Sequence, residues 1–142
     1  MSEPQAVETL CLPSSLDQLE QIDQVVERMA REMGFAEEVR SDLGICVTEA
    51  AGNAIVHAHG ERAEIPVEIC IERYADHMQI SVRDHGPGFY SQEIPDPTLP
   101  ENLLKDHGRG LHLIRALMDH VEIRRLPDGM QIIMIKKLPL AS

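Results

Sequence analysis

Two polar residues four positions apart, Glu49 and Asn53, interrupt the apolar run ICVTEAAGNAIVHAHG, and His57 continues the same stripe. On a helix, side chains at this spacing project from one face, one above the other. The ordinary alternative is an exposed polar stripe on an amphipathic helix. Gly52 favours a functional interpretation, because a glycine costs about 1 kcal/mol relative to alanine inside a helix. A ligand or another backbone that approaches closely there would offset that cost.

A second candidate segment, Asp84-His85-Gly86-Pro87-Gly88, directly follows an alternating apolar strand. A carboxylate at a strand end can accept hydrogen bonds from a planar ligand, and neighbouring glycines let that ligand approach the main chain. Asp, Gly and Pro also dominate ordinary turns. Taken alone, the segment is therefore equally typical of a structural turn.

The third candidate segment is Gly108-Arg109-Gly110-Leu111, just before an apolar pattern with helical spacing. Main-chain N–H groups at the start of a helix form an anion site, and glycines allow phosphate oxygens to approach. Arg109 or Lys105 could add positive charge. The alternative is a loop end with a glycine hinge. Neither GxxxxGK[ST] nor GxGxxG occurs in the chain, so the segment is not a P-loop.

The elements that must position these segments follow from apolar periodicity. In chain order we predict strand 6–12, helices 15–33 and 36–57, strands 67–71 and 78–82, a helix from about residue 110, and strands 121–126 and 130–137. Residues 89–107 contain three prolines without a period, and so long a loop is usually functional or mobile. This order predicts one α+β domain over residues 1–142, with a mixed or antiparallel sheet covered by helices on one face.

The composition limits the possible partners. The formal net charge of −11 argues against nucleic acid, and it requires local compensation by a metal ion, N–H groups or basic side chains at any phosphate site. No apolar stretch is long enough to span a membrane, and the first residues lack the features of a signal peptide, so we expect a cytoplasmic protein. The three cysteines have no CxxC spacing and are interpreted as reduced core thiols.

In this order the three segments resemble the ATP-binding domain shared by gyrases, a heat-shock chaperone, histidine kinases and mismatch-repair proteins. The matching residues are Glu49 and Asn53 for the N box, Asp84, Gly86 and Gly88 for the first glycine box, and Gly108 and Gly110 for the second. Over nearly its whole length the chain looks like the small anti-sigma factor serine kinases of the RsbW and SpoIIAB type. The resemblance implies a Bergerat-type two-layer sandwich, mostly antiparallel, with a long ATP lid over about residues 89–107.

The resemblance also implies roles for the first two segments. Asn53 would ligate the Mg²⁺ ion that bridges the phosphates of ATP. Glu49 would take the proton from the attacking hydroxyl group, as a general base. Asp84 would accept a hydrogen bond from the adenine amino group, while Gly86 and Gly88 would make space for the base.

For the third segment, the resemblance implies that Gly108, Gly110 and Leu111 present main-chain N–H groups to the phosphates. Some family members carry a basic residue two positions before the first glycine of this box. Here Asp106 stands at that position. Lys105 or Arg109 would then have to supply the positive charge near the γ-phosphate.

By the same resemblance, the chain would be a serine/threonine-protein kinase and an anti-sigma factor. Its substrate would be a small STAS-type antagonist protein, its competing partner a sigma factor, and its assembly a homodimer. The alternative is a nucleotide-dependent binding module that sequesters a partner without transferring phosphate. Glu49 favours the kinase, because a pure binding module has less need of a base at that position.

Overall fold

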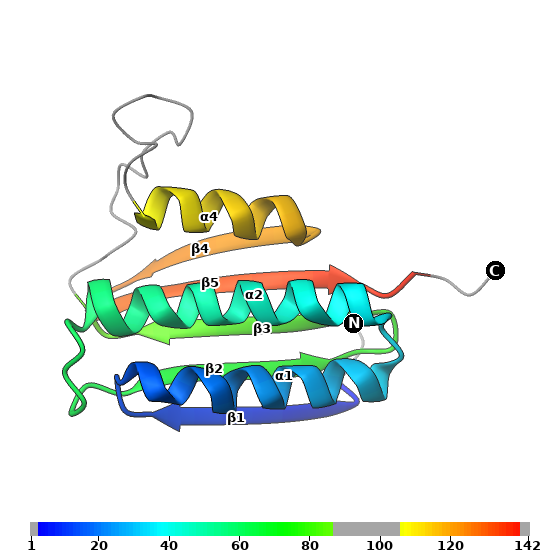
Figure 1. Ribbon diagram of the computed structural model, residues 1–142, viewed down its shortest axis with the longest axis horizontal. Helices are drawn as coiled ribbons and strands as arrows, with labels where there is room; N and C mark the ends of the chain where they lie inside the picture. The colour runs from blue at the N-terminus through cyan, green and yellow to red at the C-terminus, as the bar shows by residue number, and fades with distance from the viewer. Residues whose placement is uncertain (1–2, 87–105, 140–142) are drawn as a thin grey trace.

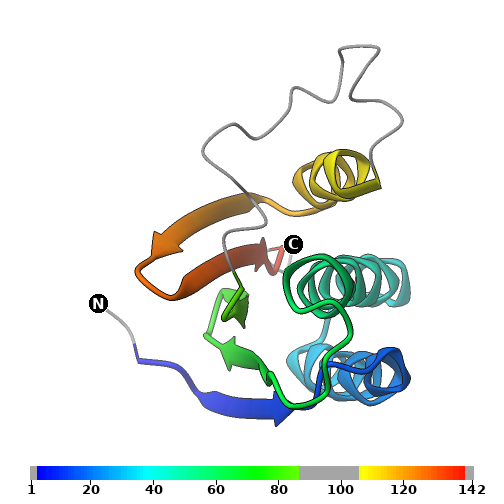
Figure 2. The same ribbon diagram turned by 90° about the vertical axis from the view of Figure 1, so that its left-hand side faces the viewer.

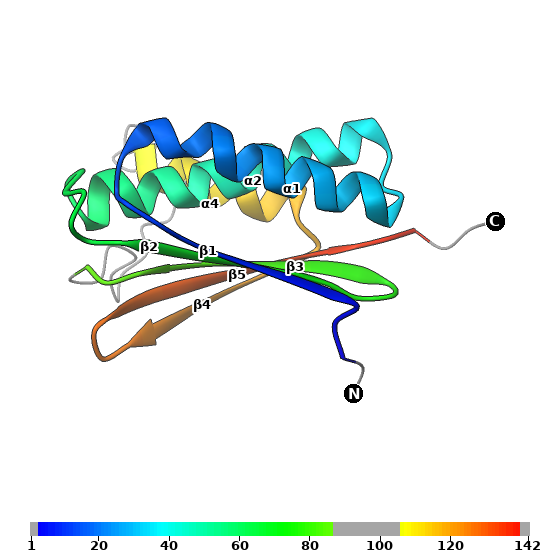
Figure 3. The ribbon, with the colours of Figure 1, turned by 90° about the horizontal axis from the view of Figure 1, so that it is seen from below.

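The protein is a two-layer sandwich of helices on a sheet, seen edge-on in Figure 3. The computed structural model describes residues 3–86 and 106–139, with the backbone alone for residues 106–109. The elements are β1 (Ala6–Leu12), the 3-10 turn η1 (Leu16–Gln18), α1 (Leu19–Met33), α2 (Glu37–Asn53), the π-helical turn η2 (Ala54–Ala58), β2 (Val67–Arg73), β3 (His77–Asp84), α4 (Asp106–Leu117), β4 (His120–Leu126) and β5 (Gly129–Lys137).

The sheet has the strand order β1-β2-β3-β5-β4, and each neighbouring pair is antiparallel. Two hairpins, β2–β3 and β4–β5, supply four of the strands, and β1 adds itself to the edge beside β2. The predicted α+β sandwich with helices on one face is therefore confirmed. Within the described residues the sheet is antiparallel throughout rather than mixed.

Strand alternation decides which side chains meet the helices. In β2, Val67, Ile69 and Ile71 are buried, while the residues between them are only half buried. Side chains of a strand point alternately to opposite faces, so these three residues face one layer. The register places Ile69 opposite Val82 of β3, which continues the same apolar face across the sheet.

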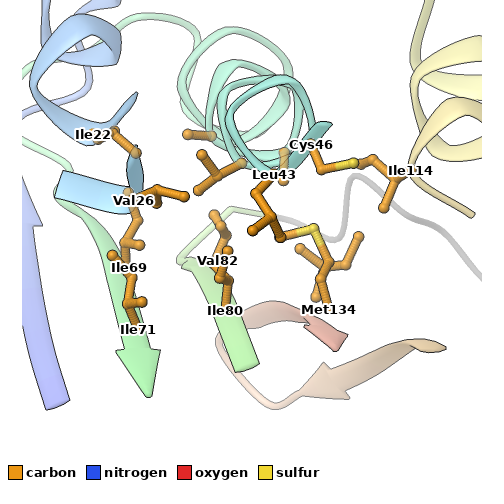
Figure 4. Close-up of a cluster of buried hydrophobic side chains, with 14 of the residues drawn as sticks. Ile22, Val26, Leu43, Cys46, Ile69, Ile71, Ile80, Val82, Ile114 and Met134 are labelled. Atoms are coloured by element: carbon orange, nitrogen blue, oxygen red, sulfur yellow. The ribbon is translucent and has the colours of Figure 1, made fainter. Parts of the chain in front are cut away.

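The helices contribute the matching apolar stripe. Ile22, Val26 and Met29 of α1 recur at helical spacing and are buried. Helix α1 ends at Gly34, whose φ of +98° is a left-handed conformation that glycine adopts without strain. Figure 4 shows side chains from the helices meeting strand side chains in one core; those labelled are Ile22, Val26, Leu43, Cys46, Ile69, Ile71, Ile80, Val82, Ile114 and Met134.

The cysteine prediction holds only in part. Cys46 is buried in this core, and its burial raises the pKa of the thiol to about 12. Cys70 is half buried, whereas Cys11 is exposed on the edge strand β1, so Cys11 is not a core thiol. All three are free thiols. In the part of the chain that the structure describes, no helix is long and apolar enough to cross a membrane.

We expect Ile71→Ala to lower the free energy of unfolding by about 2–5 kcal/mol, because the side chain is fully buried between sheet and helices. Urea denaturation followed by circular dichroism measures this change. Ile45→Ala is the matched control, since Ile45 is 45% exposed on α2. Equal losses for the two variants would contradict the assignment of the core to this face of the sheet.

Candidate functional site

The three candidate segments gather at one edge of the molecule. The end of α2, the end of β3 and the start of α4 lie together at the left of Figure 1, and Figure 2 views that edge directly. Antiparallel strand pairing and helix packing bring the ends of these three elements together, although about sixty residues of sequence separate the first candidate segment from the third. This edge holds a cavity of about 600 Å³. Its size is typical of a site for a small molecule.

The cavity is lined by residues of the first and third segments. Its lining consists of Leu19, Thr48, Glu49, Gly52, Asn53, Val56, His57, Gly110 and Leu113. Glu49 is half buried and Asn53 is only 4% exposed, and both contribute to the wall. The helical spacing therefore predicted correctly that these two residues and His57 share one face.

Glycine at position 110 brings α4 into contact with Glu49. A Cβ atom at Gly110 would lie 2.9 Å from Cδ of Glu49 and 3.0 Å from its Cγ. Such distances leave no room for a side chain unless Glu49 moves. The absence of a side chain at Gly110 thus sets where the Glu49 carboxyl group can lie in the cavity.

Gly52 has a different environment. A Cβ atom there would meet only Leu19 Cδ1, at 4.0 Å, which is an ordinary contact. Among the described residues, no other backbone approaches Gly52 closely. Gly52 therefore lies in the cavity wall with space beside it.

The backbone changes its winding directly after Asn53. The α-helical pattern ends at Asn53, and the π-helical turn η2 continues the helix to Ala58. Short π-helical turns are rare and often occur at functional sites. His57 lies in this turn and is exposed at the cavity, whereas His59, directly after it, is 2% exposed.

Asp84 ends β3 and is 3% exposed. Its Oδ1 accepts hydrogen bonds from the N–H groups of Gly86 at 3.0 Å and Met130 at 3.2 Å. These bonds orient the carboxyl group and join the loop after β3 to the start of β5. Asp84 is not one of the residues that line the 600 Å³ cavity.

The second segment joins the first through Gly86. A Cβ atom at Gly86 would lie 2.6 Å from the carbonyl oxygen of Ala58 and 2.8 Å from its Cβ. The loop after Asp84 is therefore pressed against the end of the helix that carries Glu49 and Asn53. In the described structure the protein's own backbone, rather than a ligand, fills the space beside Gly86.

His59 is the residue that sequence reasoning missed. Its Nδ1 lies 2.7 Å from Ser14 Oγ, and its Nε2 accepts a hydrogen bond from the His85 N–H at 2.8 Å. Burial lowers the pKa of His59; the charge of Asp84 raises it, and His85 lowers it further. No sequence pattern singles it out, because its partners come from distant parts of the chain.

The third segment differs from its prediction in one respect. Helix α4 begins at Asp106, about four residues earlier than expected. Gly108 lies in the first turn, where N–H groups lack partners within the helix, but Gly110 and Leu111 lie in the second turn. There, N–H groups bond to carbonyl groups four residues earlier, and Leu111 is buried in the core. The side chain of Leu111 is thus part of the core, and the role of its N–H group at the phosphates stays a prediction.

Several predicted site residues fall outside the description. Gly88, Lys105 and most of the expected lid at 89–107 lie outside the described residues. Arg109 lies in the first turn of α4, but its side chain is not described.

The residues present fit Mg²⁺ held jointly with phosphates. Within residues 3–86 and 106–139, no three His, Cys, Asp or Glu side chains come together to form a metal cage. Mg²⁺ prefers oxygen ligands and usually keeps waters and substrate phosphates around one or two protein ligands. The amide oxygen of Asn53, in the cavity wall, is a ligand of this kind.

A second hollow of about 600 Å³ lies between α1 and α2 and adjoins the first, since Leu19 and Thr48 line both. Its lining includes the carboxylates of Glu20, Asp23, Glu27 and Glu37. Glu27 is paired with Arg31 and Arg40, and hydrogen bonds from these arginines hold the pKa of its carboxyl group below the usual value. A polyphosphate would be repelled by the remaining carboxylates. The hollow at the end of α2 is therefore the better candidate for a nucleotide.

Comparisons with known proteins agree with this geometry. Residues 12–136 match the histidine kinase-like ATPase domain. The serine-protein kinase RsbW of Oceanobacillus iheyensis is 36% identical over 114 residues, which cover 76% of this chain and 72% of that protein. The chain therefore belongs to the histidine kinase-like ATPases. Within that class it belongs to the RsbW family of serine-protein kinases.

Solved structures share the fold at low sequence identity. The structure of the RsbU and RsbW domains of a Mycobacterium tuberculosis protein superposes with a TM-score of 0.69 and 14% identity. The match covers 94% of this chain but only 32% of that one. The SiaB–SiaC complex of Pseudomonas aeruginosa gives a TM-score of 0.65 and 15% identity, covering 92% of this chain and 89% of the matched chain.

We expect the stability of the protein to fall in mild acid because of His59. Its pKa is below 6.5 in the folded protein, so the unfolded chain binds the proton more readily. The free energy of unfolding should decrease as the pH drops from about 6.5 through the lowered pKa, and this contribution should be constant above pH 6.5. Urea denaturation between pH 8 and pH 5 measures it. His59→Gln should lack this component, and an identical pH dependence in both proteins would contradict the assignment.

Proposed function

We propose that the chain is an ATP-dependent serine/threonine-protein kinase that also acts as an anti-sigma factor. The observation that carries the proposal is the common position of Glu49 and Asn53 in one cavity wall, at the edge where α4 begins. A carboxylate and an amide oxygen, beside the first turn of a helix, match the needs of phosphoryl transfer: a base, a metal ligand and N–H groups for phosphates. The membership of the RsbW family supports the same activity.

In the proposed reaction, the hydroxyl oxygen of a serine or threonine attacks the γ-phosphorus of ATP. Glu49 accepts the hydroxyl proton, the new O–P bond forms, and the bond from the γ-phosphorus to the bridging oxygen breaks to release ADP. The contact with Gly110 would keep the Glu49 carboxyl group in the cavity during this step. Mg²⁺, when held by Asn53 and the phosphates, would neutralise charge that develops on the phosphate oxygens.

The adenine end of the nucleotide is proposed to lie near Asp84. Since Oδ1 of Asp84 already accepts two main-chain hydrogen bonds, we assign Oδ2 as the acceptor for the adenine amino group. Gly88 is proposed to make space for the base. Gly86 shares that proposed role, although its closest neighbour in the protein is Ala58.

The phosphates are proposed to lie at the first turn of α4. Gly108 belongs to that turn, so its N–H group is available to an anion in the way that helix starts allow. We assign Gly110 to the edge of the phosphate site through its contact with Glu49. Arg109 and Lys105 are proposed as the source of positive charge, because Asp106 occupies the position where some relatives carry a basic residue.

The proposed protein substrate is a STAS-type anti-sigma factor antagonist, and the proposed competing partner is a sigma factor. Partner switching of this kind is consistent with the RsbW family. It is also consistent with a shared fold whose solved example is a complex of two proteins, SiaB and SiaC. We further propose that the chain works as a homodimer in the cytoplasm.

A second candidate function is a nucleotide-dependent binding module that sequesters its partner without phosphotransfer. The position of Asp106 favours this alternative, because a carboxylate stands where a cation would assist the γ-phosphate. The position of Glu49 in the cavity wall favours the kinase.

We expect Glu49→Gln to lower the rate of phosphotransfer by about 10²–10⁴-fold while ATP binding is retained, because glutamine keeps the shape but cannot accept the proton. The assay mixes the protein with radiolabelled ATP, Mg²⁺ and the STAS-type protein encoded beside it. Label should move to a serine or threonine of that partner.

The matched control is Glu38→Gln, which removes an exposed carboxylate from the first turn of the same helix. This variant should transfer phosphate as the wild type does. If the wild type binds ATP tightly and labels no partner, the kinase proposal fails and the binding module stands.

We expect Asp84→Asn to weaken ATP binding by about ten- to a hundredfold, the loss typical of one hydrogen bond to a charged group. Asparagine can keep an oxygen acceptor for the N–H groups of Gly86 and Met130 but places an NH₂ group toward the adenine. Isothermal titration with ATP and Mg²⁺ measures the change, and Asp76→Asn, in the exposed β2–β3 turn, is the control. Unchanged affinity for Asp84→Asn would remove this carboxylate from the site.

A further inference from the structure

The hydrogen bonds of His59 fix its protonation. The main-chain N–H of His85 can only donate, so the Nε2 atom that accepts from it carries no proton. In a neutral ring the proton is then on Nδ1, which donates to Ser14 Oγ. The Ser14 hydroxyl in turn donates to the carbonyl oxygen of Ile65. A directional chain of hydrogen bonds therefore runs from His85 through His59 and Ser14 to Ile65.

This chain ties separate parts of the fold to the end of one helix. Ser14 follows β1, Ile65 precedes β2, and His85 follows β3. The rings of His59 and His85 also stack, with centroids 6.4 Å apart. The His85 side chain also bonds to Glu68 of β2. The loop after β3 is thus held by hydrogen bonds to both His59 and Glu68, and His59 is the buried one of these two residues.

His59 lies between the two ends of the proposed nucleotide site. His59 directly follows Ala58, against which Gly86 packs, and it ends the helix that carries Glu49 and Asn53. On its other side it bonds to the residue next to Asp84. The position of the adenine acceptor relative to the metal ligand and the base consequently depends on the hydrogen bond between His59 and His85.

We propose that His59 is a positioning residue of the nucleotide site, whose Nε2 acceptor fixes the Asp84 loop against the end of α2 and thereby sets the affinity for ATP. The inference rests on the proposed nucleotide site. It differs from a purely structural role in its chemistry, because it requires a hydrogen-bond acceptor at one particular ring position and not merely a side chain that fills the space.

Two substitutions separate these requirements. Glutamine in His59→Gln can place its amide oxygen near the position of Nε2 and accept from the His85 N–H. Asparagine in His59→Asn is shorter, so its amide reaches the position of Nδ1 and Ser14 but not His85. Both variants remove the ring and both lose packing. Only His59→Asn removes the acceptor that faces the Asp84 loop.

The experiment measures the Kd for ATP with Mg²⁺ by isothermal titration, and the unfolding free energy by urea, on the full chain. His59→Asn should bind ATP at least tenfold more weakly than the wild type, and His59→Gln should stay within about threefold. Val26→Ala, a core change in α1, controls for lost stability and should leave the Kd unchanged. Equal losses in both His59 variants, or losses that follow stability as in Val26→Ala, overturn the inference.

A pH profile provides a second measurement if His59→Asn fails to fold. A proton on Nε2 would face the His85 N–H, so wild-type affinity for ATP should fall as His59 becomes protonated. The charged and titratable groups around it are Asp84 and His85 directly, and Glu68 and Asp128 through His85. These groups and the nucleotide are also present in His59→Gln, so the ratio of the two Kd values compares proteins that differ only at residue 59.

The wild-type Kd should rise at least threefold relative to that of His59→Gln as the pH falls from 7.5 through the lowered pKa of His59. A constant ratio overturns the inference. Wild-type protein that binds no ATP at any pH would instead refute the proposed function. The two failures are therefore distinguishable.

Discussion

Helix α2 packs centrally on one face of the sheet, between α1 and α4, and the arrangement of the site depends on this packing. The apolar faces of β2, β3 and β5 have to be covered, and Leu43 and Val47 of α2 cover them. With the helix held there, its last turn lies at the edge where β3 ends. The same burial brings α4 alongside, through Ile114. Hydrophobic packing therefore determines where the polar residues meet.

The site segments lie close to one another because glycines stand at their points of contact. Gly110 lies against the side chain of Glu49, and Gly86 lies against the backbone of Ala58, at separations that would not admit a Cβ atom. The resemblance of the sequence implied that such glycines give room to the nucleotide. Here they first let the protein pack against itself, which sets the spacing between the elements before any ligand enters.

The negative charge of the protein would repel an anionic ligand if that charge were spread evenly over the molecule. The structure separates the carboxylates by position. Those of α1 and of the first turn of α2 surround the outer hollow, while the cavity at the end of α2 contains Glu49 as its one carboxylate among the described lining residues. A first helical turn and an amide oxygen lie beside that cavity. Local composition, rather than the net charge of −11, decides what this edge can bind.

The sequence by itself determined most of the helices and strands and singled out the candidate site residues. Periodicity located the helices and strands, because burial of one face imposes a spacing that is visible in the chain, and the four-residue spacing of Glu49 and Asn53 placed both on one helix face. It did not reveal where α4 begins or what His59 does. The apolar spacing that predicts α4 begins only at Leu111, whereas the helix begins at Asp106. The role of His59 depends on Ser14 and His85, which lie 45 and 26 residues away. Contacts between residues so distant arise only when the sheet and helices assemble, so only the tertiary structure decided them.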